Sequence, residues 1–188
     1  MVETGIGRRS LGGRSVDTAD RVLDAGLAVL REQGYDQLSM REVARRSGLT
    51  HATVYGYFSA KQHLVTELYW RRVQRWCEQP VEGAAPLARL TGVFTELGQL
   101  MSEEPELSVA ASAAVLSRDP DVARLRTCIG TALTGRLRRA AGSSGTPEIL
   151  DALSIAVSGA MIQAGMEYGS YTDLAERLTA VAALLLRG

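Results

Sequence analysis

Hydrogen-bond donors of several kinds are concentrated between residues 39 and 61. They are Ser39, Arg41, Thr50, His51, Thr53, Tyr55, Tyr57 and Lys61. Hydroxyl, phenol, imidazole, guanidinium and ammonium groups bind phosphate oxygens and the polar edges of bases. The segment therefore has the chemistry of nucleic-acid recognition. The sequence has no glycine-rich phosphate loop, metal-ligand cluster or nucleophile motif, so we expect no enzymatic activity, no metal and no cofactor.

Short helices are predicted to carry these side chains. Ser39 and Glu42 form a capping box, in which the Ser39 hydroxyl accepts from the Glu42 amide and the Glu42 carboxylate reaches back to the Ser39 amide. Gly48 can take the left-handed conformation that ends a helix, and Thr50 can cap the next helix. A second capping box over residues 59–62 begins a further helix. A helix, a tight turn and a second helix make a helix-turn-helix unit, which places its second helix in the major groove of double-stranded DNA.

Several of these candidates have a competing structural interpretation. Ser39 and Thr50 could act as helix caps alone, although a cap at a helix N-terminus can also bind phosphate. One of Tyr55 and Tyr57 could be mainly a core residue. His51 is a candidate base reader, or else an exposed loop histidine. The core of the unit is expected to comprise Val43, Ala44, Val54 and Phe58.

The distribution of charge supports a nucleic-acid module. The net charge is zero, but residues 1–76 contain 12 Arg or Lys against 8 Asp or Glu, and residues 77–188 contain 9 against 13. A basic first part joined to an acidic second part is typical of a DNA-binding module coupled to a different kind of domain. Residues 1–16 are predicted to be a flexible arm. Its Arg8, Arg9 and Arg14 could enter a minor groove or only raise the local positive charge.

The cellular compartment follows from what the sequence lacks. Cys77 and Cys128 are too few and too far apart for a zinc motif or a disulfide framework. No signal peptide is visible, and the apolar runs are too short to span a membrane. These features predict a cytoplasmic protein without a membrane partner.

The remaining sequence predicts an all-α fold of about nine helices. The helix that begins at Ser59 runs to residue 79, where Pro80 stops it. Apolar residues at helical spacing then predict helices over residues 86–102, 106–117, 120–141, 147–168 and 172–187. We expect a flexible arm at 1–16, a DNA-binding domain with its connecting helix at 17–79, and a ligand-binding and dimerisation domain at 80–188.

The last two predicted helices are apolar on more than one side. In the first of them, Leu153 and Val157 mark one face, whereas Ile155 and Ile162 mark another. A helix that is apolar on two faces needs two partners. One face can pack in its own domain and the other against a second copy, so helices 147–168 and 172–187 are predicted to form a homodimer. The alternative is that both helices are central to the core of a monomer.

The chain resembles TetR-family transcriptional regulators, strongly over residues 17–70 and only in architecture after that. The resemblance rests on the capped second helix, Gly48, and the run Thr53-Val-Tyr55-Gly-Tyr57-Phe58-Ser-Ala-Lys61. It implies that Lys61, the only lysine in the chain, binds a phosphate. One departure is Gly56, where many relatives have a larger residue. This glycine puts a DNA contact from that position in doubt.

The resemblance also implies how the protein works. A dimer reads a palindromic operator, represses transcription in the default case, and releases DNA when a ligand binds among the helices of the second domain. The apolar composition of that domain suits a hydrophobic small molecule. The candidate ligand-binding residues are Phe94, Met101, Cys128, Met161, Gln163 and Met166. The alternative function is an all-helical protein–protein adaptor whose helix-turn-helix is structural.

Overall fold

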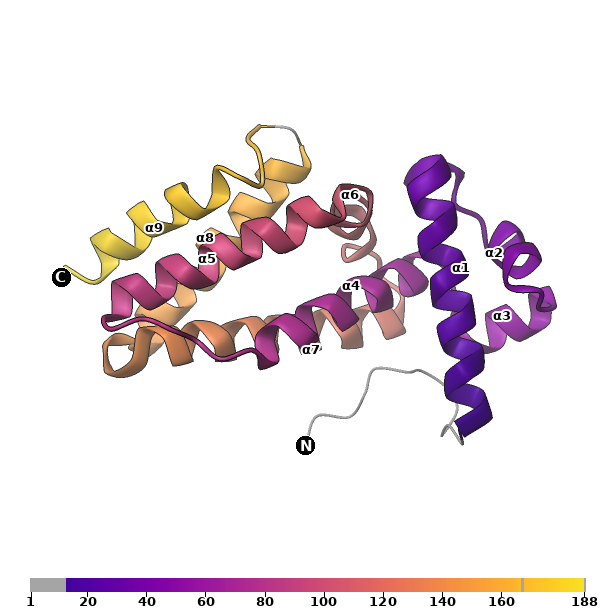
Figure 1. The fold of residues 1–188 in the computed structure, drawn as a ribbon, viewed down its shortest axis with the longest axis horizontal. Helices are drawn as coiled ribbons and strands as arrows, with labels where there is room; N and C mark the ends of the chain where they lie inside the picture. Colours follow the sequence, from indigo (N-terminus) through magenta and orange to yellow (C-terminus); the bar gives the residue numbers. More distant parts are fainter. Residues whose placement is uncertain (1–12, 167, 188) are drawn as a thin grey trace. The chain divides into compact units, whose positions relative to one another are not determined.

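A computed structural model describes residues 13–166 and 168–187, and within these ranges the secondary structure is entirely helical (Figure 1). The helices are α1 Gly13–Gln37, α2 Met40–Ser47, α3 His51–Tyr57, α4 Lys61–Glu78, α5 Pro86–Glu103, α6 Pro105–Ala114, α7 Pro120–Ala141, α8 Pro147–Gly165 and α9 Leu174–Leu185, with a short 3₁₀ turn at Gly142–Ser144. The predicted all-α fold class is confirmed. None of the described helices is both long enough and apolar enough to cross a bilayer.

The helices group into two compact units. The first unit contains the chain up to Arg71 together with Glu106–Thr127, and the second contains Arg72–Pro105 together with the chain from Cys128 onward. Helices α4 and α7 each begin in the first unit and end in the second. The predicted division into binding domains near residue 80 stays a prediction, whereas the compact units divide within α4, between Arg71 and Arg72.

The first unit packs around α1. This helix begins at Gly13 and so includes the last four residues of the predicted arm at 1–16. Gly34 interrupts it with a φ of 76° before a last turn reaches Gln37. Arg8 and Arg9 of the predicted arm, and the side chain of Arg14, lie outside the described residues. Helix α1 approaches α4 so closely that a Cβ on Gly26 would meet Leu64 Cδ2 at 2.5 Å. The packed core that results supports α2 and α3 from behind.

The second unit is built on α5, which packs along α9, and α9 in turn packs on α8 (Figure 1). Residues Leu90, Val93, Phe94, Leu97 and Met101 bury one face of α5. Two arginines of α7 bind the last carbonyls of α4: Arg136 Nη1 donates to Gln79 O at 2.8 Å, and Arg139 donates to Cys77 O. Because carbonyls at a helix C-terminus lack helical partners, these bonds hold the end of α4 in place.

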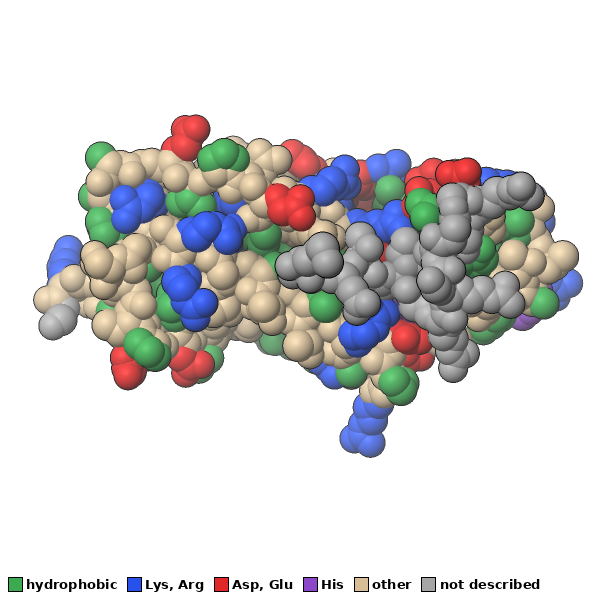
Figure 2. All heavy atoms as spheres, turned by 90° about the horizontal axis from the view of Figure 1, so that it is seen from below, with side chains coloured by type: hydrophobic (Ala, Val, Ile, Leu, Met, Phe, Trp, Pro, Cys, Tyr) green, Lys and Arg blue, Asp and Glu red, His purple; other side chains and the backbone are tan. Residues whose placement is uncertain are grey.

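Helices α8 and α9 each have one buried and one exposed apolar side. Leu150, Leu153, Val157, Ala160 and Ala164 of α8 are buried, as their spacing predicts. Ile155 and Ile162 of α8, Met166 after it, and Leu184 of α9 are all exposed, with Ile155 65% exposed and Leu184 71%. Hydrophobic side chains also reach the surface on the face of this unit shown in Figure 2, where they lie among separate basic and acidic groups. The two helices are shorter than predicted, since α8 ends at Gly165 and α9 begins at Leu174.

Candidate nucleic-acid interface

Helix α2 begins with a cap that is only half of the predicted capping box. The Ser39 hydroxyl accepts from the Glu42 N–H at 3.3 Å, as expected. The Glu42 carboxylate does not reach back to Ser39 but accepts from Arg45 Nε at 2.8 Å and Arg45 Nη2 at 2.5 Å. Two charge-assisted bonds outweigh one bond to an amide, and they lower the pKa of Glu42. The Ser39 cap is thus confirmed, and the predicted role of the carboxylate is wrong.

The turn and the start of α3 follow the sequence closely. Gly48 has a φ of 66°, and its N–H binds Arg45 O at 3.3 Å, which ends α2. Thr50 then caps α3, because its hydroxyl accepts from the Thr53 N–H at 3.1 Å and also bonds the Thr53 hydroxyl at 2.8 Å. Short-range bonds therefore fix the N-terminus of α3, the end of a helix that best binds phosphate.

The inner side of α3 is buried and its outer side is open. Val54 and Phe58 are 0% and 1% exposed, so they anchor the helix in the core. On the outer side, the rings of His51 and Tyr55 meet edge to face with centroids 4.6 Å apart, and Tyr55 is 40% exposed. Gly56 has no atom within 4 Å of the position of a Cβ, so the helix backbone is accessible beside Tyr55. We call the exposed side of His51, Tyr55 and Gly56 the α3 outer face.

Tyr57 does not share this outer face. Its side chain is only 9% exposed, whereas Tyr55 two positions earlier points outward. One tyrosine is therefore exposed and the other buried. This agrees with the packing interpretation of the pair, in which one of the two, here Tyr57, is mainly a core residue. A DNA contact by Tyr57 stays a prediction, as does one by Tyr55.

The arginines of α2 differ in their partners. Arg46 binds Glu32 of α1 through two bonds of 2.5 and 2.6 Å, which lower the pKa of Glu32. Arg45 is held by Glu42, as described above. Arg41, one residue into α2, is exposed and makes none of the hydrogen bonds or ion pairs found among the described residues. Of these three guanidinium groups, Arg41 is thus the one available to a nucleic acid without breaking an ion pair.

Lys61 is engaged within the protein. Its Nζ donates to Tyr35 O at 3.0 Å and lies 4.5 Å from the centroid of the Tyr35 ring. This ammonium therefore binds a carbonyl near the end of α1, and a phosphate would have to compete with that carbonyl. The phosphate-binding role of Lys61 stays a prediction.

The candidate ligand-binding residues do not surround one cavity. Phe94 and Met101 are buried, Cys128 and Met161 are half-buried, and Gln163 and Met166 are exposed. The amide oxygen of Gln163 accepts a hydrogen bond from Arg177 of α9. None of the six lines the 660 Å³ cavity of this unit, so their role stays a prediction. Within the described residues, no group of His, Cys, Asp and Glu could hold a metal ion.

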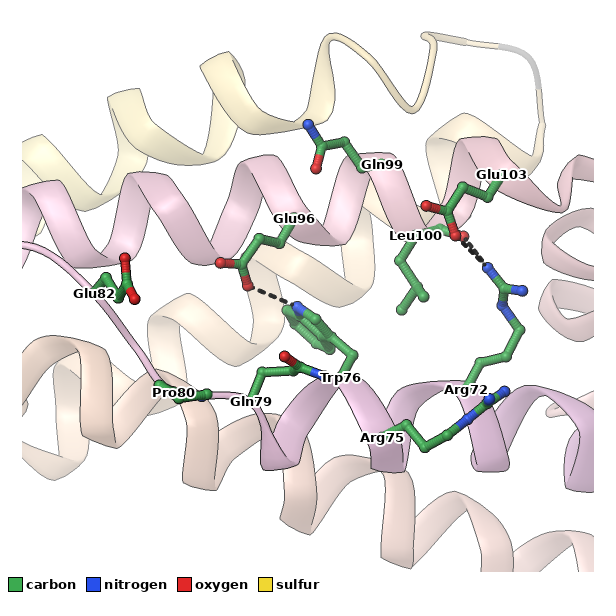
Figure 3. A pocket seen from close by; sticks show the side chains of 10 residues that line it. All are labelled: Arg72, Arg75, Trp76, Gln79, Pro80, Glu82, Glu96, Gln99, Leu100 and Glu103. Carbon is green, nitrogen blue, oxygen red and sulfur yellow. Dashed lines mark hydrogen bonds and ion pairs between the residues drawn. The ribbon is translucent and has the colours of Figure 1, made fainter.

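That cavity is a cleft of about 660 Å³ between α4 and α5 in the second unit (Figure 3). It is lined by Arg72, Arg75, Trp76, Gln79, Pro80, Glu82, Glu96, Gln99, Leu100 and Glu103. Trp76 Nε1 donates to Glu96 at 3.0 Å, and Arg72 Nη2 donates to Glu103 at 2.9 Å. These two links join α4 to α5, and Leu100 points into the space between them (Figure 3).

A buried arginine supports one end of the cleft. Arg136 of α7 is 0% exposed, binds Glu96 through Nη2, and lies 4.7 Å from the Trp76 ring centroid. Sequence reasoning missed this cluster, because its members are 20 to 60 positions apart. The only signal available was a tryptophan and an arginine at core positions of predicted helices.

Comparisons with known proteins agree with the geometry of α2 and α3. Residues 22–68 match the profile of bacterial regulatory proteins of the tetR family. An HTH-type transcriptional regulator of Mycobacterium tuberculosis is 37% identical over 178 residues, which cover 93% of this chain and 83% of that protein. The transcriptional repressor KstR of Rhodococcus jostii is 28% identical over 172 residues, covering 88% and 81% of the two chains.

A solved structure shows the same fold. The TetR-family repressor FadR of Thermus thermophilus, in complex with lauroyl-CoA, superposes with a TM-score of 0.68 at 19% identity and covers 90% of this chain and 94% of its own. The sequence relatives match nearly the whole chain, and both are transcriptional regulators by name. Together with the helix-turn-helix geometry of α2 and α3, they show that the chain belongs to the TetR family of DNA-binding transcriptional regulators.

Proposed function

We propose that this regulator is a homodimeric repressor that occupies a palindromic operator and leaves it when a hydrophobic small molecule binds the second unit. The observation that carries the DNA side is the α3 outer face, which is open while Val54 and Phe58 hold the helix from behind. The repressor KstR, similar over most of the chain, supports repression rather than activation.

The DNA side is tested by selecting duplexes from a random pool with the full-length protein. A two-fold dimer contacts two half-sites about one helical turn apart, or a multiple of it, so the selected sequences should be inverted repeats. Enrichment of a single unpaired half-site would contradict the dimer. Failure to enrich any sequence at low salt would contradict the function itself, because phosphate contacts are strongest there.

The proposed dimer uses the exposed apolar side of α8 and α9. Ile155 and Ile162 of α8 and Leu184 of α9 are all exposed. Large exposed apolar patches are uncommon on monomeric proteins and mark interaction surfaces. Ile155→Glu should therefore shift the sedimentation of the protein from dimer to monomer. Leu116→Glu is the matched control, because Leu116 is 70% exposed but lies in the other unit. A monomeric wild type would overturn the proposed dimer.

For the ligand, we propose a molecule with a long apolar part and a polar head, and fatty acyl-CoA thioesters are the first class to test. The cleft between α4 and α5 offers polar groups to the head, while Phe94 and Met101 on the buried side of α5 offer an apolar environment. The FadR structure in complex with lauroyl-CoA has the same fold.

Calorimetric titration with lauroyl-CoA, laurate and coenzyme A measures how much the apolar part and the polar head each contribute to the affinity. The proposal expects binding by lauroyl-CoA that is at least tenfold tighter than by either fragment. Trp76→Phe should change the affinity for lauroyl-CoA, because it removes the donor to Glu96 while keeping an aromatic ring at this position. Lack of binding by lauroyl-CoA would remove this class of ligand.

A further inference from the structure

Ser59, the residue after the C-cap of α3, is bonded to the start of α7. Ser59 Oγ donates to Asp119 Oδ2 at 2.8 Å, across 60 positions of the sequence and within the first compact unit. The other oxygen, Asp119 Oδ1, accepts from the N–H groups of Asp121 at 2.8 Å and Val122 at 3.4 Å. A single carboxylate therefore caps α7 and holds the chain just beyond α3.

His63 completes this cluster from the side of α4. It is 0% exposed, and its Nδ1 accepts from the Ser59 N–H at 3.2 Å. The same nitrogen lies 3.6 Å from Asp121 Oδ2, and the ring packs edge to face on Phe58 with centroids 5.3 Å apart. Both polar groups of Ser59, its amide and its hydroxyl, are thus used in bonds that connect α3, α4 and α7.

The charge of Asp119 strengthens the arrangement. Partial burial opposes its ionisation, but the bonds from Ser59 and from the two amides outweigh that effect, and the pKa of Asp119 is lowered. An ionised carboxylate accepts stronger hydrogen bonds than a neutral one. The bond to Ser59 is therefore made by the charged form at neutral pH.

The position of the cluster in the chain links it to both α3 and α7. Phe58 is the C-cap of α3, and its N–H binds Val54 O at 3.0 Å, so α3 cannot shift without moving Ser59. Helix α7 is continuous from Pro120 to Ala141, and its last turns bind the end of α4 through Arg136 and Arg139. Helix α7 therefore has hydrogen bonds at its start to the chain beyond α3 and near its end to the end of α4.

We propose that Ser59, His63 and Asp119 form a coupling latch through which α7 sets the position of α3. The proposal rests on the DNA-binding function above and adds the residues that regulate it. Ser59 and Asp119 are positioning residues, because they act on DNA through α3. Coupling between distant sites can be carried by hydrogen-bond networks and rigid helices, and the latch joins the chain beyond α3 to α7.

The test is amide hydrogen exchange of the full-length protein with and without a duplex obtained by selection, and it needs no ligand. In the wild type, the duplex should slow exchange in α3 and also at Asp121 and Val122. Ser59→Ala should keep the protection in α3, but the protection at Asp121 and Val122 should fall at least fivefold. Ser59→Thr retains the hydroxyl and should restore the protection at these two residues.

Ser117→Ala is the matched control, because Ser117 Oγ bonds the Asp119 N–H at 3.2 Å in the same turn but not Ser59. This variant should transmit protection like the wild type. Protection of α7 that survives in Ser59→Ala, or that is absent in the wild type, would overturn the latch while leaving DNA binding intact.

Exchange in the DNA-free protein separates failure of the latch from failure of the proposed function. In the DNA-free protein, Ser59→Ala should speed exchange at both His63 of α4 and Val122 of α7, because the Ser59–Asp119 bond supports both helices. Faster exchange on only one side would overturn the latch. Absence of any selected duplex would instead count against DNA binding, which the DNA-free measurement does not need.

Discussion

The α3 outer face and the α4–α5 cleft are built in opposite ways. Hydrogen bonds between residues three to five positions apart cap α2, form the turn and cap α3, as with Thr50 and Thr53. The cleft is held by Trp76 with Glu96, Arg72 with Glu103, and Arg136 with Glu96, which are 20 to 40 positions apart. A surface made by local hydrogen bonds is already formed in the free protein. A cleft held by separate long-range hydrogen bonds can open, because each bond can break without the others. A stable reading surface and an adjustable ligand site are what a ligand-responsive regulator needs.

The largest expected effect comes from removing a buried side chain that supports α3. Phe58→Ala removes a side chain that is 1% exposed and should destabilise the protein by about 3–5 kcal/mol. Urea unfolding measures this loss, and Leu116→Ala is the exposed control. A loss below about 1 kcal/mol would show that the core does not hold α3, since surface substitutions stay within about 0.5 kcal/mol.

The next effect is a pH dependence of stability that arises from Cys77 of α4 in the second unit. Burial raises the pKa of Cys77 on α4 to about 11, from 9.0. The folded state holds this proton more tightly than the unfolded state, so the stabilisation is complete below pH 9 and is lost as the pH rises toward 11. The loss should be about 2–3 kcal/mol. Unfolding curves at pH 8 and pH 11 should differ more for the wild type than for Cys77→Ala, and equal pH dependence would contradict the buried thiol.

Arg41→Ala tests whether this side chain contacts a base or a phosphate of the operator. Loss of this exposed guanidinium should weaken operator binding by about 10- to 100-fold if it reads a base, since a bidentate base contact contributes about 1–3 kcal/mol. The selected sequence would then lose its preference at one position in each half-site. A phosphate contact would instead weaken all duplexes alike and reduce the salt slope by about 1. Arg45→Ala is the control, because Glu42 already holds that side chain.

The smallest expected effect concerns the cap of α3. Thr50→Ala removes the bond to the Thr53 N–H and should cost about 1 kcal/mol of stability, while Thr50→Ser should cost little. Thermal unfolding measures both. If the outer face is preformed by this cap, Thr50→Ala should also weaken DNA binding, with no change in lauroyl-CoA binding. Equal losses at both sites would contradict the separation of the two regions.

How much the sequence predicts follows the same division. The cap of Ser39, the left-handed Gly48, the cap of Thr50 and the two faces of α8 depend on residues within one or two turns of each other, and all are confirmed. The role of Glu42 was wrong because Arg45 competes for it three positions away. The bonds of Ser59 to Asp119 and of Arg136 to Glu96 could not be predicted, since they depend on how distant helices pack.

The central claim is that α3 reads a duplex through its outer face, and Tyr55→Ala tests it most directly. Binding of the selected duplex is measured by fluorescence anisotropy across a salt series, with Tyr168→Ala as the control, since Tyr168 is 81% exposed in the second unit. The account predicts at least tenfold weaker binding for Tyr55→Ala at every salt concentration, unchanged folding, and wild-type binding for Tyr168→Ala. Equal binding by Tyr55→Ala and the wild type would contradict it.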